Sequence, residues 1–491
     1  MAEDHSQKVP GRTLERLRPL FHPLDIASLV YFRIAFGAIM LWEVYRYLTG
    51  GRVAAYYIEP AFHFTYLGFG WIQPWPGEGM YTHFYVMGAL AACIMAGFLY
   101  RLSTVLFFLA FTYVFLLEEA YYLNHFYFVA LVAFLLIFIP AHRTFSIDAW
   151  LRGPAWRSSV APAWCLWVLR FQMGCVYFFA GIAKLSADWL QGYPFGEWLR
   201  GAELPAVFEA LLAPTWVGIL ASWGGMFFDL LVVAFLLWRP TRAWAFGASL
   251  AFHLMNAALF QIGIFPWFSI AATLLFFDPD WPRRLLARLR SVAEPAARPT
   301  AFGWREKATG VFVVAFVTLQ VLIPLRPYLY SGNTSWTDEG HRFSWRQMLQ
   351  DEDGFVRFVV KDPASGGFSK VDPTPYLTER QYAKLTRAPY LIIEFAHYLA
   401  DAAEQQGKSR PQVRALALSS MNGRELQQLV DETIDLAAEP QRFFTRYPWV
   451  LSLEVPLEAQ WDGESPPQHP ATLAAIERIR AEAEAKLSEI R

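Results

Sequence analysis

Long apolar runs constrain the fold of this chain more than any other feature. Eight of them are each close to the roughly 20 residues that a helix needs to cross the hydrocarbon core of a bilayer. They are 26–48, 80–99, 102–117, 126–140, 163–182, 217–237, 243–259 and 308–325. A shorter run, 265–277, reads as a ninth span or as a buried, tilted helix. The pattern predicts a polytopic α-helical membrane protein with eight or nine transmembrane helices.

Composition supports this prediction. Only 17% of the residues are charged, whereas a soluble domain has about 25%. The net charge of −1 creates no field that would recruit nucleic acid, so we expect no nucleic-acid partner. Cys93, Cys165 and Cys175 lie in apolar runs without metal or redox spacing, and we expect structural thiols and no metal.

Basic residues orient the predicted helices. They gather before the first span and in alternate connections, which the positive-inside rule assigns to the cytoplasm. Examples are Arg18, Arg101, Arg143, Arg239 and Arg283. The alternation requires 265–277 to cross the membrane, which favours nine spans over eight. We therefore expect a cytoplasmic segment at 1–25, a transmembrane helical domain at 26–325 and an extracytoplasmic domain at 326–491.

The last third of the chain has a different pattern. The segments 355–361, 413–420 and 450–457 alternate apolar and polar residues like strands. Residues 378–407 read as a helix interrupted by Pro389, and 471–491 as an amphipathic helix. The sequence thus predicts a C-terminal extracytoplasmic α+β domain. The polar N-terminal stretch lacks the apolar core of a cleavable signal peptide. The Ala- and Arg-rich composition favours a bacterial plasma membrane over an endoplasmic reticulum membrane, which has the same physical signature.

Polar side chains gather in the outer leaflet of the predicted bundle. Ionisable groups within spans are costly and are candidates for function. Asn124 and His125 stand at the outer end of the fourth span, and Lys184 stands at the outer end of the fifth. His253 and Asn256 are three residues apart, and therefore share one face of the seventh.

Each of these groups also has a structural interpretation. Lys184 could anchor the helix at the interface beside Trp189, or pair with Asp188 four residues later. His125 could bond the backbone at a helix end, and His253 could join helices by hydrogen bonds. Other charged residues in the spans are interpreted as structural pairs, because intramembrane charges usually pair with one another. They are Arg33, Glu43, Arg46, Arg170 and Asp229.

Four sequence blocks resemble the vitamin K-dependent γ-glutamyl carboxylases, which are HTTM-domain proteins. They are "YFFAGIAKLSADWLQGY", "NHFYF", "FHLMNAALFQIGIFPW" and "SWTDEGHRFSWRQML", and the resemblance spans about 24–457. It implies that Lys184 is the catalytic lysine and His125 the functional histidine. It further implies quinone-binding or supporting roles for Asn124, His253, Asn256, Trp189 and Tyr177, and a peptide-facing side with Trp336, Trp345 and Arg357.

The resemblance also implies a reaction. Such an enzyme deprotonates vitamin K hydroquinone (menaquinol or phylloquinol), oxygenates it with O2 to the epoxide, and couples this to the addition of CO2 to a glutamate of a protein or peptide. Its partners would be the lipid bilayer, the quinone and that protein. An ammonium cannot accept a proton, so Lys184 must be neutral when it acts. A carboxylate nearby favours the ammonium, and we therefore predict that Asp188 turns away or pairs elsewhere.

One stretch departs from the family. Animal enzymes carry histidine and arginine after the "SW" block, whereas this chain has "QDEDGFVR". Asp351, Glu352 and Asp353 are expected to form an acidic lip that repels a glutamate-rich peptide, which leaves quinol oxygenation better supported than carboxylation. Two alternatives stay open: a quinol epoxidase or oxidoreductase without a peptide substrate, and a non-enzymatic transporter or lipid-binding scaffold. The absence of an internal repeat disfavours a transporter.

Overall fold

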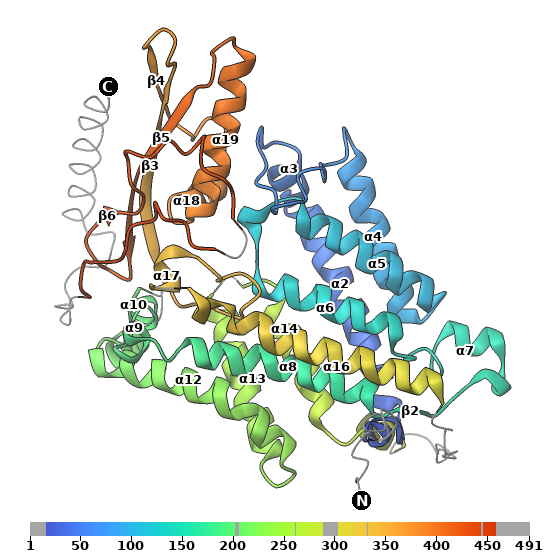
Figure 1. Ribbon diagram of the computed structural model, residues 1–491. Coiled ribbons are helices and arrows are strands. Elements are labelled where there is room, and N and C mark those ends of the chain that lie inside the picture. The colour runs from blue at the N-terminus through green and yellow to red at the C-terminus, as the bar shows by residue number, and fades with distance from the viewer. Residues whose placement is uncertain are drawn as a thin grey trace, which may run out of the picture.

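A computed structural model describes residues 16–201, 206–260, 262–287, 303–330, 332–442 and 445–457. Within these residues, a helical part from Arg18 to Leu329 is followed by an α+β region that begins at Thr334. Figure 1 shows the sheet and its long helix standing on one end of the helical part. The helix predicted at 471–491 and the first 15 residues of the predicted cytoplasmic segment lie outside the described residues.

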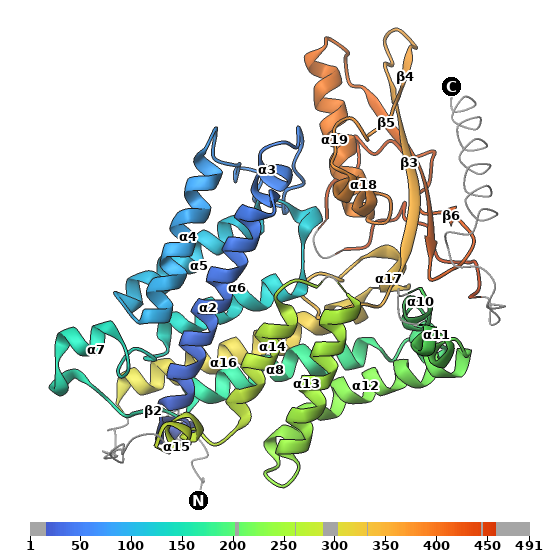
Figure 2. The same cartoon turned by 180° about the vertical axis from the view of Figure 1, so that it is seen from behind.

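Four helices of the first half pack side by side, as both views show (Figures 1 and 2). In chain order these are α2 (Ala27–Thr49), α4 (Gly79–Ala96), α5 (Tyr100–Leu116) and α6 (Asn124–Phe138). Short elements connect them: η1 (Arg18–Phe21), β1 (Pro23–Asp25), α3 (Arg52–Tyr57), η2 (Glu119–Tyr121), α7 (Ile147–Arg152), η3 (Pro154–Trp156) and β2 (Val160–Pro162), which pairs antiparallel with β1.

The second half adds a layer of helices across the first. The long ones are α8 (Trp164–Ala183), α12 (Thr215–Leu237), α13 (Arg242–Leu259) and α16 (Trp304–Leu325). Helix α8 packs along α12 and α16, while α14 (Phe265–Thr273) lies between α13, α8 and α2. The short elements are α9 (Ala187–Leu190), α10 (Phe195–Arg200), α11 (Ala206–Leu212), η4 (Leu274–Phe276), α15 (Trp281–Ala287) and η5 (Arg326–Leu329).

All nine predicted apolar segments are helical in the structure. Five helices are long and apolar enough to cross a membrane: Ala27–Thr49, Gly79–Ala96, Ala163–Ala183, Thr215–Leu237 and Trp304–Leu329. Three more are apolar but shorter: Tyr100–Leu116, Asn124–Phe138 and Phe265–Phe276. Helix α13 belongs to neither group. The structure therefore supports an integral membrane protein, and it does not confirm the count of eight or nine spans.

The α+β region is built on a four-stranded antiparallel sheet with the order β4-β3-β5-β6. The strands are β3 (Glu352–Lys361), β4 (Phe368–Val371), β5 (Gln412–Met421) and β6 (Gln427–Gln428). The helices are α17 (Thr334–Thr337), α18 (Glu379–Leu385) and α19 (Pro389–Gln405). Pro389 begins α19, where a missing N–H costs little. The strands predicted at 355–361 and 413–420 and the interrupted helix are confirmed. The strand predicted at 450–457 is wrong, because Val450 makes only an isolated bridge to Val430.

Buried polar contacts join the two parts. Gln381 of α18 donates to Glu118 at 2.7 Å, and Glu394 of α19 accepts from the Thr65 amide at 2.7 Å. Burial raises the pKa of Glu394 to about 8. The hydrophobic core of the α+β region includes Phe64, which belongs to the connection between α3 and α4. The α+β region is therefore packed into the outer connections of the helices and does not merely follow them.

Gly37 lies where α2 and α4 pack tightly together. A Cβ at this position would lie 2.6 Å from the Met95 nitrogen and 2.7 Å from the Ala91 oxygen. These are backbone atoms, so Gly37→Ala should force the helices apart at about 1–3 kcal/mol. We expect a lower thermal unfolding midpoint for the detergent-solubilised protein.

Gly247 provides the matched control, because a Cβ there meets nothing within 4 Å. Gly247→Ala in α13 should be neutral or stabilising by up to about 1 kcal/mol, since alanine is the better helix former. Equal midpoints for the two variants would contradict the tight contact at Gly37.

Candidate active site

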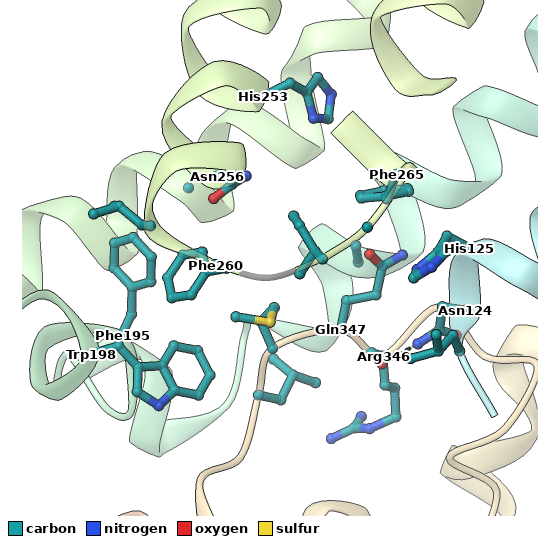
Figure 3. A pocket seen from close by; sticks show the side chains of 18 of the residues that line it. Asn124, His125, Phe195, Trp198, His253, Asn256, Phe260, Phe265, Arg346 and Gln347 are labelled. Carbon is teal, nitrogen blue, oxygen red and sulfur yellow. Dashed lines mark hydrogen bonds between the residues drawn. The ribbon is translucent and has the colours of Figure 1, made fainter. Parts of the chain in front are cut away.

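One large cavity lies where the helices meet the α+β region. Its volume is about 1020 Å³, at the upper end of the range of about 300–1,000 Å³ for ligand pockets. Helices α6, α8, α12, α13 and α14 contribute to its wall, as does the segment 346–350 that leads into β3. Figure 3 shows Phe195, Trp198 and Phe260 on one side of the cavity and Phe265 on the other, beside His125. The cavity is thus lined both by apolar side chains of the helices and by residues of the α+β region.

Lys184 is buried in this wall. It follows the last residue of α8, its side chain is 8% exposed, and its Nζ forms an ion pair with Asp229 of α12. The ring of Trp189 lies 5.1 Å from the same nitrogen, and the Trp189 indole is fixed by a 2.7 Å hydrogen bond to the Ser222 carbonyl. A buried, paired amine is not the arrangement of a lysine that snorkels to an interface.

Asp188 pairs elsewhere, as predicted. Its two carboxylate oxygens accept from Arg424 at 2.7 and 2.9 Å, and one also accepts from Asn422 at 2.8 Å. The partner of Lys184 is Asp229, which the sequence led us to group with the structural pairs. One signal for it was available, because Asp229 is the only charged residue of its span and Lys184 stands at the end of another.

The two histidines line the same cavity. His253 is fully buried, with Nε2 bonded to the Tyr177 hydroxyl at 2.6 Å and Nδ1 without a partner among the described residues. The Phe265 ring lies 5.9 Å from the His253 ring and 5.8 Å from the His125 ring. Asn256, one turn after His253, also faces the cavity (Figure 3). The structure therefore brings both histidines, Asn256 and Lys184 into the lining of one cavity.

Asn124 lines the cavity, and its side-chain amide is bonded to the lining segment 346–350 and to Tyr122. Its Nδ2 donates to the Arg346 carbonyl at 2.7 Å, and its Oδ1 accepts from the Tyr122 hydroxyl at 3.0 Å. The next residue after Arg346, Gln347, extends toward His125 in Figure 3. Its Nε2 is buried and has no partner among the described residues. No sequence pattern pointed to Gln347, because its place depends on a contact between distant segments.

The lining of the cavity is rich in cations. Besides Lys184 they are Arg346, Arg380, Lys384 and Arg387 of the α+β region, and Arg46 and Arg52 of the helical part. Two of them form long ion pairs: Lys384 Nζ is 3.6 Å from Asp338, and Arg387 Nε is 3.8 Å from Glu352. Burial lowers the pKa of Lys384, against the attraction of Asp338. Arg46 is held more closely by Glu43, at 2.6 Å, whereas Lys384 and Arg387 retain capacity to bind an anion.

The acidic lip expected at 351–353 is not formed. None of Asp351, Glu352 and Asp353 is among the described residues that line the cavity. Asp351 is paired through its backbone with Asn422, and Asp353 accepts from the amide of Gly354 at 2.8 Å. Glu352 is buried at the start of β3, where burial raises its pKa to about 8. Glu352 lies behind the lining, where it accepts from Gln350 at 3.1 Å and is 3.8 Å from Arg387, so the three residues do not form the expected lip.

The three residues expected on the peptide side do not line the cavity either. Trp336 is 1% exposed in the core of the α+β region and donates to the Leu451 carbonyl at 2.8 Å. Trp345 is fully buried and stacks on Tyr127 with ring centroids 5.0 Å apart. Arg357 is on β3 and pairs with Asp372 at 3.1 Å. All three have packing partners that account for their positions.

Comparison with known families agrees with this arrangement. The HTTM domain matches residues 21–281, which is more than half of the chain. The vitamin K-dependent gamma-carboxylase, lumenal domain, matches residues 305–455. No solved structure matches the chain significantly. The two domains cover the helices and the α+β region that together enclose the cavity, and the chain therefore belongs to the vitamin K-dependent gamma-carboxylase family of HTTM-domain proteins.

Proposed function

We propose that this chain oxygenates vitamin K hydroquinone to its epoxide and couples this to the carboxylation of glutamate in a protein substrate. The observation that carries the proposal is a single cavity with two chemically different kinds of lining. Lys184, His125 and His253 stand among apolar side chains of the helices, and cations from both parts of the chain line the same cavity, among them Arg46, which like His125 lies beside Gly263. A lipid-soluble quinol suits the apolar lining, and an acidic side chain suits the cations.

The apolar lining fits a quinol. Two buried nitrogens, His253 Nδ1 and Gln347 Nε2, lack partners among the described residues. Because a buried polar group without a partner is costly, they are available for the oxygens of a bound hydroquinone. The aromatic side chains of Phe195, Phe260 and Phe265 suit its ring and lipid tail. When bound, the quinol supplies, with O2, the strong base that removes the γ-hydrogen of glutamate.

Lys184 is the proposed general base. Its neutral amine would take the proton of a hydroquinone O–H, and the ammonium that results is stabilised by Asp229. His125 and His253 would hold the oxygen that loses the proton, as preorganised groups aimed at a developing negative charge.

The cationic lining supports a peptide substrate. Charge-assisted hydrogen bonds from arginine to a carboxylate are stronger than neutral ones, and Arg380, Lys384 and Arg387 line the same cavity as Lys184. The argument for an epoxidase without a peptide substrate drew in part on an acidic lip at 351–353, and none of these residues lines the cavity. The product of carboxylation would enter water from the α+β side, which we place outside the cytoplasm.

The activity can be tested with purified protein in lipid nanodiscs, supplied with vitamin K hydroquinone, O2, labelled bicarbonate and a glutamate peptide. We expect epoxide and labelled peptide together. Lys184→Ala should lower both by about 10²–10⁴-fold, the usual contribution of a general base, whereas Lys361→Ala on β3 should change neither. Epoxide without label would favour the epoxidase, and neither product would favour a non-enzymatic role.

Asp229→Asn tests the ion pair. Removing the carboxylate weakens Lys184 as a base, so the amine stays neutral to a lower pH but takes the quinol proton more slowly. We expect the acidic limb of the pH–rate profile to move to lower pH by about 1–3 units, and the maximal epoxidation rate to fall. An unchanged acidic limb would remove Asp229 from this role.

A further inference from the structure

The turn between β5 and β6 contacts the segment that carries Lys184. Asn422 and Gly423 have φ angles of 55° and 77°. Asn and Gly tolerate this left-handed conformation, and the Arg424 amide closes the turn by donating to the Met421 carbonyl at 3.3 Å. The turn brings the side chains of Asn422 and Arg424 from the α+β region onto α9. We call residues 421–424 the docking turn.

The docking turn donates three hydrogen bonds to the Asp188 carboxylate. Arg424 donates to both carboxylate oxygens in a fork, and Asn422 donates to Oδ2. The side chains of Arg424 and Asp188 are 6% and 12% exposed. A forked arginine–carboxylate pair is both strong and geometrically specific. Because the pair is nearly buried, removing Arg424 would leave Asp188 as an unpaired charge that must find another cation.

The nearest alternative cation along the chain is Lys184. Asp188 follows it by four residues and precedes Trp189, whose ring lies 5.1 Å from the lysine Nζ. Asp229 on α12 pairs with Lys184, and Glu197 on α10 lies beside Gly423 of the docking turn. The other cation near the turn, Arg200, interacts with Glu197, so an undocked Asp188 would be drawn to the ammonium of Lys184.

The docking turn is also tied to the cavity wall. The backbone N–H of Asn422 donates to the Asp351 carbonyl at 2.8 Å, and the backbone N–H of Asp351 donates to the side-chain Oδ1 of Asn422 at 2.9 Å. Asp351 directly follows the lining segment 346–350. The position of the turn and the shape of the cavity therefore depend on each other.

We propose that Arg424 and Asn422 are positioning residues that hold Asp188 away from Lys184, so that the base has Asp229 as its one carboxylate partner. The inference rests on the proposed role of Lys184. It gives the α+β region a second role, because this region then contributes cations to the cavity and also sets the proton affinity of an amine within the helices. Without the docking turn, two carboxylates would share the amine and keep it charged.

The protonation of Lys184 can be measured without quinone turnover. Acetic anhydride acetylates only the neutral amine, and mass spectrometry gives the pH at which Lys184 is half reactive in the full-length protein. A second carboxylate stabilises the ammonium, so Arg424→Ala should raise this pH by about 1–3 units and lower epoxide formation at neutral pH at least tenfold. The double variant Asp188→Asn/Arg424→Ala should return both to near the parent values.

Several results would overturn the proposal. One is that folded Arg424→Ala leaves the pH of half-reaction of Lys184, the labelling pH, unchanged. The other is that the labelling pH stays raised in the double variant Asp188→Asn/Arg424→Ala. Arg424→Lys keeps the positive charge but loses the forked hydrogen bonds, so it should raise the labelling pH by less. It replaces Arg424→Ala as the test if the alanine variant does not fold. Arg414→Ala, at the other end of β5, is the matched control and should change nothing. If the parent forms no epoxide, the proposed function fails, and the labelling result still decides the docking turn.

Discussion

The cost of burying a charge explains most of the arrangement around Lys184. An isolated ammonium inside an apolar wall is expensive, and a partner of opposite charge offsets only part of this cost. Asp229 from the neighbouring helix supplies that partner. The close packing of α8 on α12 follows the same need, because a Cβ at Gly181 of α8 would lie 2.9 Å from the backbone nitrogen of Leu230. Helix spacing and the ion pair therefore depend on each other.

The cavity has both apolar and cationic lining because both parts of the chain contribute to it. Apolar helices provide a compartment for a lipid-soluble molecule, and the α+β region provides arginine and lysine that can contact water. Neither part encloses the space alone. The segment 346–350 closes the wall, and it is held by Asn124 of α6 on one side and by the docking turn, through Asp351, on the other.

Local features of the structure could be predicted from the sequence, and long-range ones could not. Apolar length identified all nine helical segments, and Pro389 identified the break between α18 and α19, because these properties act within a few residues. Asp229 lies 45 positions from its partner, and no local pattern selects it over the nearer Asp188. The prediction for the acidic stretch 351–353 was wrong for a related reason, since the direction of its side chains is set by the pairing of β3 with β5.

The burial of Phe64 in the core of the α+β region has a consequence for how such proteins diversify. A loop of the helical part completes the core of the α+β region, so the boundary between the two matched families is not a boundary between independent folding units. Recombination at residues 282–304 would separate Phe64 from the core it fills and Asp188 from Arg424. New substrate preferences in this lineage are thus expected to arise by substitution around the cavity, and not by exchange of whole modules.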